Sequence, residues 1–219
     1  SEIAPAIERP RKYFGSFAGH GAVPYGQDPA EELHDDNGKN GEAALLLALQ
    51  TQADMSPQVQ YFAKSCTAAY AVRNFGHCGP FWAQLWQPLA ANLGGTNAMA
   101  AHFKEIAWEL DLSRRPNGSF VYHGSTGASG GTTDALGTDS DTAKVMLTYA
   151  TALKKICLTG KNASPNNWLS ANDVSEAIAD GIGTLPFEMK TWTTNPLVTA
   201  LSSWSVHKRR LAAEELVTR

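Results

Sequence analysis

Helix-forming apolar segments, separated by glycine- and proline-rich breaks, are the feature that most constrains the fold of this chain. The segment GEAALLLALQ, at 41–50, contains strong helix formers and is apolar nearly all round, which is typical of a buried helix. Ser56 and Pro57 then provide an N-cap and a first-turn proline for a second helix. Its apolar residues recur with i, i+3, i+4, i+7 spacing. By the same reasoning, helices are predicted at 41–51, 57–73, 80–93 and 97–111, and again from 141.

These helices are expected to pair as hairpins, 41–51 with 57–73 and 80–93 with 97–111. Pro88 is expected to end or kink its helix, because proline lacks the backbone N–H that an α-helix uses. Apolar helices that alternate with Gly-rich loops predict an all-α fold. The specific expectation is an α/α superhelix or a partial toroid, with the most apolar helices inside.

Three regions are predicted along the chain: an irregular lead-in at 1–40, an α/α hairpin domain at 41–165, and C-terminal helices at 166–219. The C-terminal region ends in two short helices that resemble one HEAT-like hairpin. A single helical repeat leaves its far face uncovered, because such repeats bury their cores by stacking. Further repeats or a partner protein are therefore expected at this hairpin. Its predicted internal contacts join Leu197, Val198 and Leu201 to Leu211, Ala212 and Leu216.

Composition excludes several classes of protein. The chain has 219 residues, of which 43% are hydrophobic and 18% charged, and its formal charge of -3 gives no basic footprint for nucleic acid. Its three cysteines show no CxxC spacing, so neither a disulfide framework nor a structural zinc site is supported. The uncharged run at 74–103 is too broken by polar residues to span a membrane. The first residues lack the apolar core of a signal peptide.

The polar segment HDDNGKNG, at 34–41, has two interpretations. It does not match a calcium loop, because position 12 of the EF-hand pattern would have to be acidic and is a leucine here. In the structural interpretation, Asn40 is the N-cap of the following helix and Glu42 complements its positive end. In the functional interpretation, Asp35 or Asp36 pairs with Glu42 at the mouth of a toroid, and Lys39 lies beside them. Glycosidases use such carboxylate pairs.

Three histidines beside glycines form a second group of candidates. His20, His77 and His123 each lie on a predicted loop, and loops at one end of a toroid could bring them together. The alternative is that each histidine bonds a backbone carbonyl in a tight turn. In GHCGPFW, His77 could line a pocket together with Phe81 and Trp82, or the segment could be a packed turn. Cys78 is a further candidate nucleophile.

Metal and cofactor sites find little support. The zinc ligands available are Cys78, His77, His102 and His123, yet the Asp-x-Cys spacing of prenyltransferase zinc sites is absent. The Gly-rich segment at 124–131 lacks both the following helix and the distant acid of a dinucleotide fingerprint. It also lacks the GK[ST] ending of a P-loop. Neither a metal nor a cofactor is therefore expected.

Several long motifs carry a resemblance to a known family. They are RKYFGSFAGHGAVPYG, DNGKNGEAALLLALQ, YFAKSCTAAY, GHCGPFWAQLWQPLAANLGG, KEIAWELDLSRRPNGSFVYHG and VMLTYATALKKICLTGK. Together they resemble an uncharacterised bacterial domain family, itself similar to the α/α toroids of terpenoid cyclases, prenyltransferases and six-hairpin glycosidases. Members often carry HEAT-like repeats afterwards. The resemblance implies the fold, slightly favours a secreted or periplasmic location, and brings no established reaction.

Two functional hypotheses follow. The first is a non-catalytic binding or scaffold domain whose toroid mouth binds a glycan or a peptide. The second is a carbohydrate-active hydrolase or lyase that uses Asp36, Glu42 and His77. Trp82 and Trp86 favour the enzyme, because aromatic faces suit the stacking of sugars, whereas tryptophans in helical proteins usually belong to the core.

Overall fold

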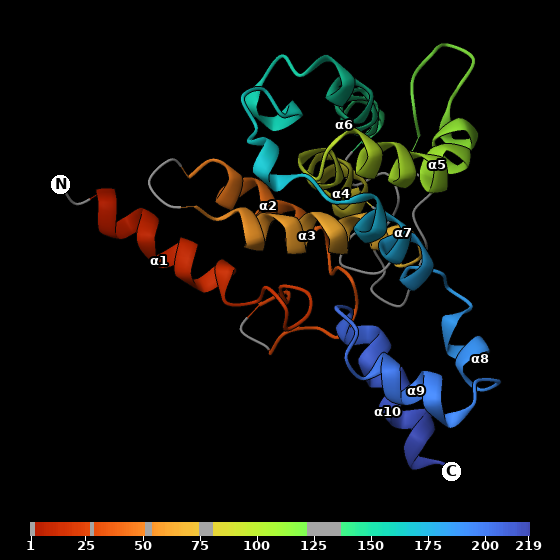
Figure 1. Cartoon of the computed structure of the whole chain (residues 1–219). Coiled ribbons are helices and arrows are strands. Elements are labelled where there is room, and N and C mark those ends of the chain that lie inside the picture. Colours follow the sequence, from red (N-terminus) through yellow and green to blue (C-terminus); the bar gives the residue numbers. More distant parts are fainter. Residues whose placement is uncertain (1–2, 27–28, 51–53, 75–80, 122–136) are drawn as a thin grey trace.

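A computed structural model describes residues 3–26, 29–50, 54–74, 81–121 and 137–219 (Figure 1). These residues form ten α-helices and no β-strand, which confirms the all-α class. Two isolated β-bridges join Ala22 to Glu31 and Arg114 to Phe120. The helices are α1 (Ile3–Gly15), α2 (Lys39–Ala48), α3 (Ser56–Ala68), α4 (Phe81–Leu93), α5 (Thr96–Ser113), α6 (Gly137–Ala150), α7 (Ala171–Asp180), α8 (Leu185–Met189), α9 (Thr194–Ala200) and α10 (Val206–Val217).

The main core lies where α2, α3 and α4 pack against one another. Its largest fully buried apolar side chains include Leu47, Phe62 and Leu89, one from each helix. Helices α2 and α4 approach closely at Gly41, where an added methyl carbon would lie 2.6 Å from the carbonyl oxygen of Trp86. The apolar character of 41–50 is therefore explained by contacts with two helices, as the sequence predicted.

Proline and glycine act differently along α4. The helix ends at Leu93, before Gly94 and Gly95, as predicted, and Gly95 has a φ of 98° that favours glycine. Pro88, in contrast, lies inside the helix, which continues past it. Of the two effects predicted for Pro88, an end of the helix near Gln87 is therefore wrong, and a kink stays a prediction. Both Gln87 and Leu89 are buried on either side of the proline, so tertiary packing holds the helical path there.

The first 40 residues are more regular than predicted. Helix α1 contains Pro10 yet runs for 13 residues. Its polar side holds Glu8, which pairs with Arg11 at 2.5 Å and with Lys12 at 3.4 Å. Such i, i+3 and i, i+4 pairs support a helix that has few apolar positions. The expectation of an irregular segment is wrong for α1.

Helices α5 and α6 form a second layer on α4. A small core of Ile106, Leu110, Phe120 and Val145 lies between them. Helix α6 begins at Gly137, four residues before the predicted start at 141. An isolated bridge between Arg114 and Phe120 follows the end of α5.

The C-terminal helices α8, α9 and α10 enclose their own core, at the end of the molecule away from α6 (Figure 1). Leu197 and Ala212 are fully buried there, as predicted. Val198 and Leu201 are instead 52% and 40% exposed, and Ala200 takes the inward position, because a helix turn brings residues three apart to one face. Helix α8 was not anticipated. The superhelical arrangement and the HEAT-like character of this hairpin stay predictions.

Three contacts tie this C-terminal unit to the N-terminal residues. His34 Nε2 lies 2.9 Å from Ser205 Oγ, Arg209 donates to the carbonyl of Gly19 at 3.1 Å, and Arg210 pairs with Glu32 at 2.6 Å. Among the described helices, none is long and apolar enough to cross a membrane.

Candidate functional site

The carboxylate of Asp35 caps helix α2. It accepts hydrogen bonds from the backbone N–H groups of Gly38 at 3.0 Å and Asn40 at 2.9 Å. Asn37 and Gly38 have φ of 52° and 73°, which turn the chain so that Asp35 reaches the start of the helix. Because the helix begins at Lys39, the prediction that Asn40 is the N-cap is wrong.

Asn40 instead joins three segments from within the first turn of α2. Its Oδ1 accepts from Val23 N–H at 2.8 Å, and its amide donates to the carbonyl of His34 at 2.8 Å and to Ser65 Oγ at 3.2 Å. The side chain is fully buried. Its role is therefore to satisfy backbone groups between the lead-in and α3, which a sequence pattern alone could not separate from capping.

Burial raises the pKa of Asp35 to about 6, although hydrogen bonds from Gln87, Asn40 and Gly38 oppose this shift. The Gln87 amide donates to Asp35 at 2.7 Å. Its hydrogen bonds to Gly38, Asn40 and Gln87 are all buried, and Asp35 is 2% exposed. Asp35 therefore points inward, as a structural group enclosed by helices.

The other charged residues of this segment are held at its surface. Asp36 accepts from the N–H of Tyr25 at 3.1 Å and from the amide of Asn37 at 2.9 Å. Lys39 and Glu42 form an ion pair of 2.9 Å along the first turn of α2. The acidic Glu42 in that turn agrees with the predicted interaction with the positive helix end.

The structure brings part of the predicted site together. A methyl carbon added at Gly38 would lie 2.4 Å from the carbonyl oxygen of Trp82, so Trp82 packs beside the start of α2. Phe81 is buried, with the Lys144 ammonium 5.0 Å from its ring centroid. His20 is exposed in the segment after α1. The candidates His77, Cys78 and His123 lie outside the described residues.

A cavity of about 700 Å³ lies elsewhere, between α7 and the C-terminal helices. Its charged lining consists of Glu176 and Asp180 from α7 and Lys208 from α10. Two tryptophans, Trp192 and Trp204, contribute aromatic faces. The hydroxyl groups come from Thr199, Ser202 and Ser203. The volume falls within the range of small-molecule sites.

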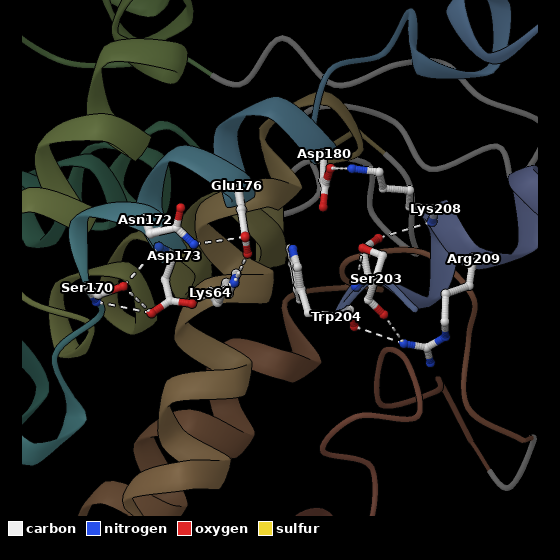
Figure 2. Close-up of polar contacts among 11 residues, drawn as sticks. Lys64, Ser170, Asn172, Asp173, Glu176, Asp180, Ser203, Trp204, Lys208 and Arg209 are labelled. Carbon is white, nitrogen blue, oxygen red and sulfur yellow. Dashed lines mark hydrogen bonds and ion pairs between the residues drawn. The ribbon is translucent and has the colours of Figure 1, made fainter. Parts of the chain in front are cut away.

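Lys64 anchors one side of this cavity. This α3 residue is buried, and its ammonium lies 2.7 Å from both Asp173 and Glu176 (Figure 2). It also lies 4.8 Å from the ring centroid of Trp204. Asp173 belongs to a capping box with Ser170 at the start of α7. The hydrogen bond from Lys64 lowers the pKa of Glu176, so this carboxyl stays ionised.

The opposite side is held by a second ion pair. Lys208 lies 2.5 Å from the buried Asp180, and its backbone N–H donates to Ser205 Oγ at 3.1 Å. Arg209 donates to the carbonyls of Ser203 at 2.6 Å and Trp204 at 3.2 Å. Figure 2 shows the Trp204 indole between the Lys64 cluster and the Lys208–Asp180 pair. Several elements thus fix the tryptophan before any ligand arrives.

The indole Nε1 of Trp204 is buried and has no hydrogen-bond partner within the described part of the chain. A buried donor without a partner is uncommon and calls for an explanation, such as a bound water or ligand. The cavity therefore offers an aromatic face and ion-paired carboxylates. Among the described residues, no group of three or more His, Cys, Asp or Glu side chains is placed to hold a metal ion.

Comparison with known families gives one match. A family described as a domain of unknown function (DUF6288) matches residues 1–160. The chain belongs to this family. No curated protein and no solved structure gives a significant match. All residues that line the 700 Å³ cavity follow the segment that matches DUF6288, so membership in the family says nothing about this cavity.

Sequence reasoning missed every residue of this cavity. Two signals were available. Glu176 and Asp180 are four residues apart on a short helix, which places them on one face. Lys64 interrupts the apolar segment YFAKSC, where a buried lysine requires an acidic partner. Neither signal identifies the partner residues. Lys64 lies 109 and 112 residues from Asp173 and Glu176, and Lys208 lies 28 residues from Asp180.

Proposed function

We propose that this DUF6288 chain is a non-catalytic binding protein whose cavity between α7 and α10 holds a neutral, hydroxyl-rich oligosaccharide. The observation that carries the proposal is the fixed Trp204 indole, placed between two ion pairs in a cavity of about 700 Å³. A sugar presents an apolar face to an aromatic ring, while its hydroxyls bond to polar groups at the rim. This follows the common composition of small-molecule sites.

The charge balance favours a neutral ligand. Glu176 and Asp180 are each paired with a lysine, so neither presents an uncompensated charge to the cavity. A paired carboxylate still has lone pairs that accept hydrogen bonds from sugar hydroxyls. The hydroxyl groups of Thr199, Ser202 and Ser203 also line the cavity. An anionic ligand would meet two carboxylates, and a cationic one would compete with two lysines.

The pKa shifts favour binding over hydrolysis at this cavity. A glycosidase needs one carboxyl that stays protonated to act as the general acid. The pKa of Glu176 is shifted down, by its hydrogen bond to Lys64, which is the wrong direction for that role. The hydrolase or lyase hypothesis with Asp36, Glu42 and His77 stays a separate prediction.

Matched variants separate these two hypotheses. Oligosaccharides would be screened on an array, and the best ligand measured by titration calorimetry. Glu176→Gln removes a carboxylate from the cavity, whereas Glu42→Gln makes the same change at the predicted catalytic residue. We expect Glu176→Gln to weaken binding about 10-fold, equivalent to one charge-assisted hydrogen bond, and Glu42→Gln to leave it unchanged.

Other results would reject the proposal. Loss of glycan binding in Glu42→Gln but not in Glu176→Gln would mean that the glycan site lies at the start of α2 instead. Release of reducing ends by the wild-type protein, abolished by Asp36→Asn, would establish the hydrolase instead. Absence of saturable binding to any neutral oligosaccharide on the array would reject the cavity as a glycan site.

We also propose that the exposed face of the C-terminal hairpin contacts another helical repeat or a partner protein. The supporting observation is that Val198 and Val217 are 52% and 86% exposed on neighbouring helices. Self-association is tested by sedimentation of the wild type and of the double variant Val198→Asp with Val217→Asp. A glycan titration of the same double variant tests whether the cavity is unaffected. Identical sedimentation would reject self-association through this face.

A further inference from the structure

Two further cavities lie beside α5, α6 and the segment that follows α6. The first cavity, of about 370 Å³, is mainly apolar, with Met99, Ala100 and Phe103 from α5 and Tyr149 from α6. Phe103 and Tyr149 meet edge to face, with ring centroids 5.5 Å apart. We refer to it as the apolar cavity.

Two of the polar side chains that line the apolar cavity have their hydroxyl protons occupied. Thr148 and Thr151 line it, but their hydroxyls donate to the carbonyls of Lys144 at 3.3 Å and of Thr148 at 2.7 Å. Their hydroxyl protons are therefore used inside α6 and the turn that follows. A ligand portion without hydrogen-bonding groups fits this environment best.

The second cavity, of about 300 Å³, is polar and shares two lining residues with the first. Asn92 and Lys154 line both cavities. The polar cavity adds Lys161, Asn162 and Trp168. Neither cavity has an aspartate or glutamate among its lining residues, and no described carboxylate forms an ion pair with Lys154 or Lys161. The polar end therefore carries two positive charges without described counter-charges.

The loop that carries these lysines is fixed to the helices. Asn92 of α4 donates to the carbonyl of Thr159 at 3.2 Å, and Lys161 N–H donates to the carbonyl of Ile156 at 3.0 Å. Lys154 and Asn162 have φ of 48° and 62°, two of the three positive values among described non-glycine residues. Such backbone conformations persist only where the surroundings enforce them. The backbone positions of both lysines are therefore set in advance.

We propose that these two neighbouring cavities, which share Asn92 and Lys154, together bind a small amphipathic anion, namely a single alkyl chain that ends in a carboxylate. The chain lies among Met99, Phe103 and Tyr149, and the carboxylate lies between Lys154 and Lys161. This site is independent of the proposed glycan cavity, with which it shares no lining residue. The apolar cavity lies entirely within the DUF6288 match.

The test uses three probes that separate the apolar and the charged parts of the ligand. Decanoate has both parts, decan-1-ol lacks the charge, and butyrate lacks six methylene groups. Binding would be measured by titration calorimetry and by the fluorescence of Trp168, with Trp168→Phe identifying its signal. Because each fully buried methylene contributes about fourfold in affinity, half-burial of six predicts that butyrate binds about 50-fold more weakly than decanoate.

Variants then assign the two ends of the ligand. The double variant Lys154→Gln with Lys161→Gln should weaken decanoate about 10-fold or more and leave decan-1-ol unchanged. Lys155→Gln is the matched control, because this neighbouring lysine lines neither cavity, and it should bind decanoate like the wild type. Ala100→Trp fills the apolar cavity and should weaken both probes. Circular dichroism and urea midpoints verify that each variant is folded.

Several results would overturn the proposal. The first is that decan-1-ol binds as tightly as decanoate. The second is that Lys155→Gln and the double variant lose the same amount of affinity for decanoate. The third is that decanoate shows no saturable binding below its critical micelle concentration. A membrane source is tested with phosphatidylglycerol vesicles. Binding to vesicles without binding to free decanoate would replace the small-molecule site with a membrane-surface contact and would overturn the proposal as stated.

Discussion

Replacing Asp35 with asparagine should change how the stability of this protein depends on pH. Asp35 is buried, and its pKa is raised from 3.8 to about 6, chiefly by burial. Since the folded state then binds a proton more tightly than the unfolded state, this carboxyl makes the protein less stable as the pH rises from about 4 to about 6. The asparagine has no such proton and removes this effect.

The magnitude follows from the shift. The rise from 3.8 to about 6, at about 1.36 kcal/mol for each pH unit, corresponds to about 3 kcal/mol in total. About 2 kcal/mol of this falls between pH 4 and pH 7, because the carboxyl is already partly ionised at pH 4 in the unfolded chain. The free energy of unfolding of the wild type, minus that of Asp35→Asn, should therefore decrease by about 2 kcal/mol from pH 4 to pH 7.

Only this difference isolates Asp35, because its neighbour acts in the opposite direction. Burial, and then the adjacent His207, lower the pKa of His34 to about 3. The unfolded chain then binds the proton more readily, so His34 makes the protein less stable as the pH falls from about 6.5 toward 3. Both the wild type and Asp35→Asn contain His34, so its effect cancels in the comparison.

The assay is urea unfolding at pH 4, 5, 6 and 7, monitored by tryptophan fluorescence and circular dichroism. Asp35→Asn also places an amide N–H against the N–H groups of Gly38 and Asn40, which costs about 1–3 kcal/mol at every pH. Val59→Ala, a core truncation without a titrating group, is the control and should lower stability equally at pH 4 and pH 7. A wild-type to Asp35→Asn difference that is constant over this range would refute the reasoning.

Three further predictions concern stability. Gly41→Ala should lower the free energy of unfolding by about 1–3 kcal/mol despite the better helix propensity of alanine, because the methyl carbon meets the Trp86 backbone; an unchanged urea midpoint would contradict this. Lys64→Met should cost about 1–2 kcal/mol at pH 7 and less at pH 4, because Glu176 of the unfolded chain then binds a proton and the stabilisation that comes from its lowered folded-state pKa shrinks; urea titrations at both pH values would measure this. Ser205→Ala should increase amide hydrogen exchange in α10 about 5-fold or more, because it removes both the N-cap and the contact with His34. Exchange in α2 should stay unchanged. Exchange in α10 at the wild-type rate would exclude this role of Ser205.

The sequence was sufficient to predict elements whose determinants are local. The helix 41–50 is apolar nearly all round, and Gly94 and Gly95 end α4, so both features were predicted correctly. Pro88 does not end α4, because tertiary packing around Gln87 and Leu89 holds the helical path there, and a local sequence pattern does not report this packing. Helix α1 was missed because Glu8, Arg11 and Lys12 stabilise it through side-chain pairs rather than an apolar stripe.

Site prediction fails for a different reason. The 700 Å³ cavity is assembled from Lys64, from Glu176 and Asp180, and from Lys208, which lie far apart in the chain. Hydrophobic periodicity reports which face of a helix is buried, yet it does not report which helix covers that face. The polar segment at 34–41 is, in contrast, dense in the sequence and therefore conspicuous.

That conspicuous segment and the cavity are nevertheless connected. The His34 ring lies 5.6 Å from the ring of Trp204, and its Nε2 lies 2.9 Å from Ser205 Oγ. Ser205 in turn caps α10, which carries Lys208. Because buried polar groups must find partners, a segment rich in them is expected wherever separate parts of a chain are joined. The density of polar residues at 34–41 is thus explained by the junction that positions the cavity, and substitutions at His34 should affect ligand binding through Trp204 without contacting the ligand.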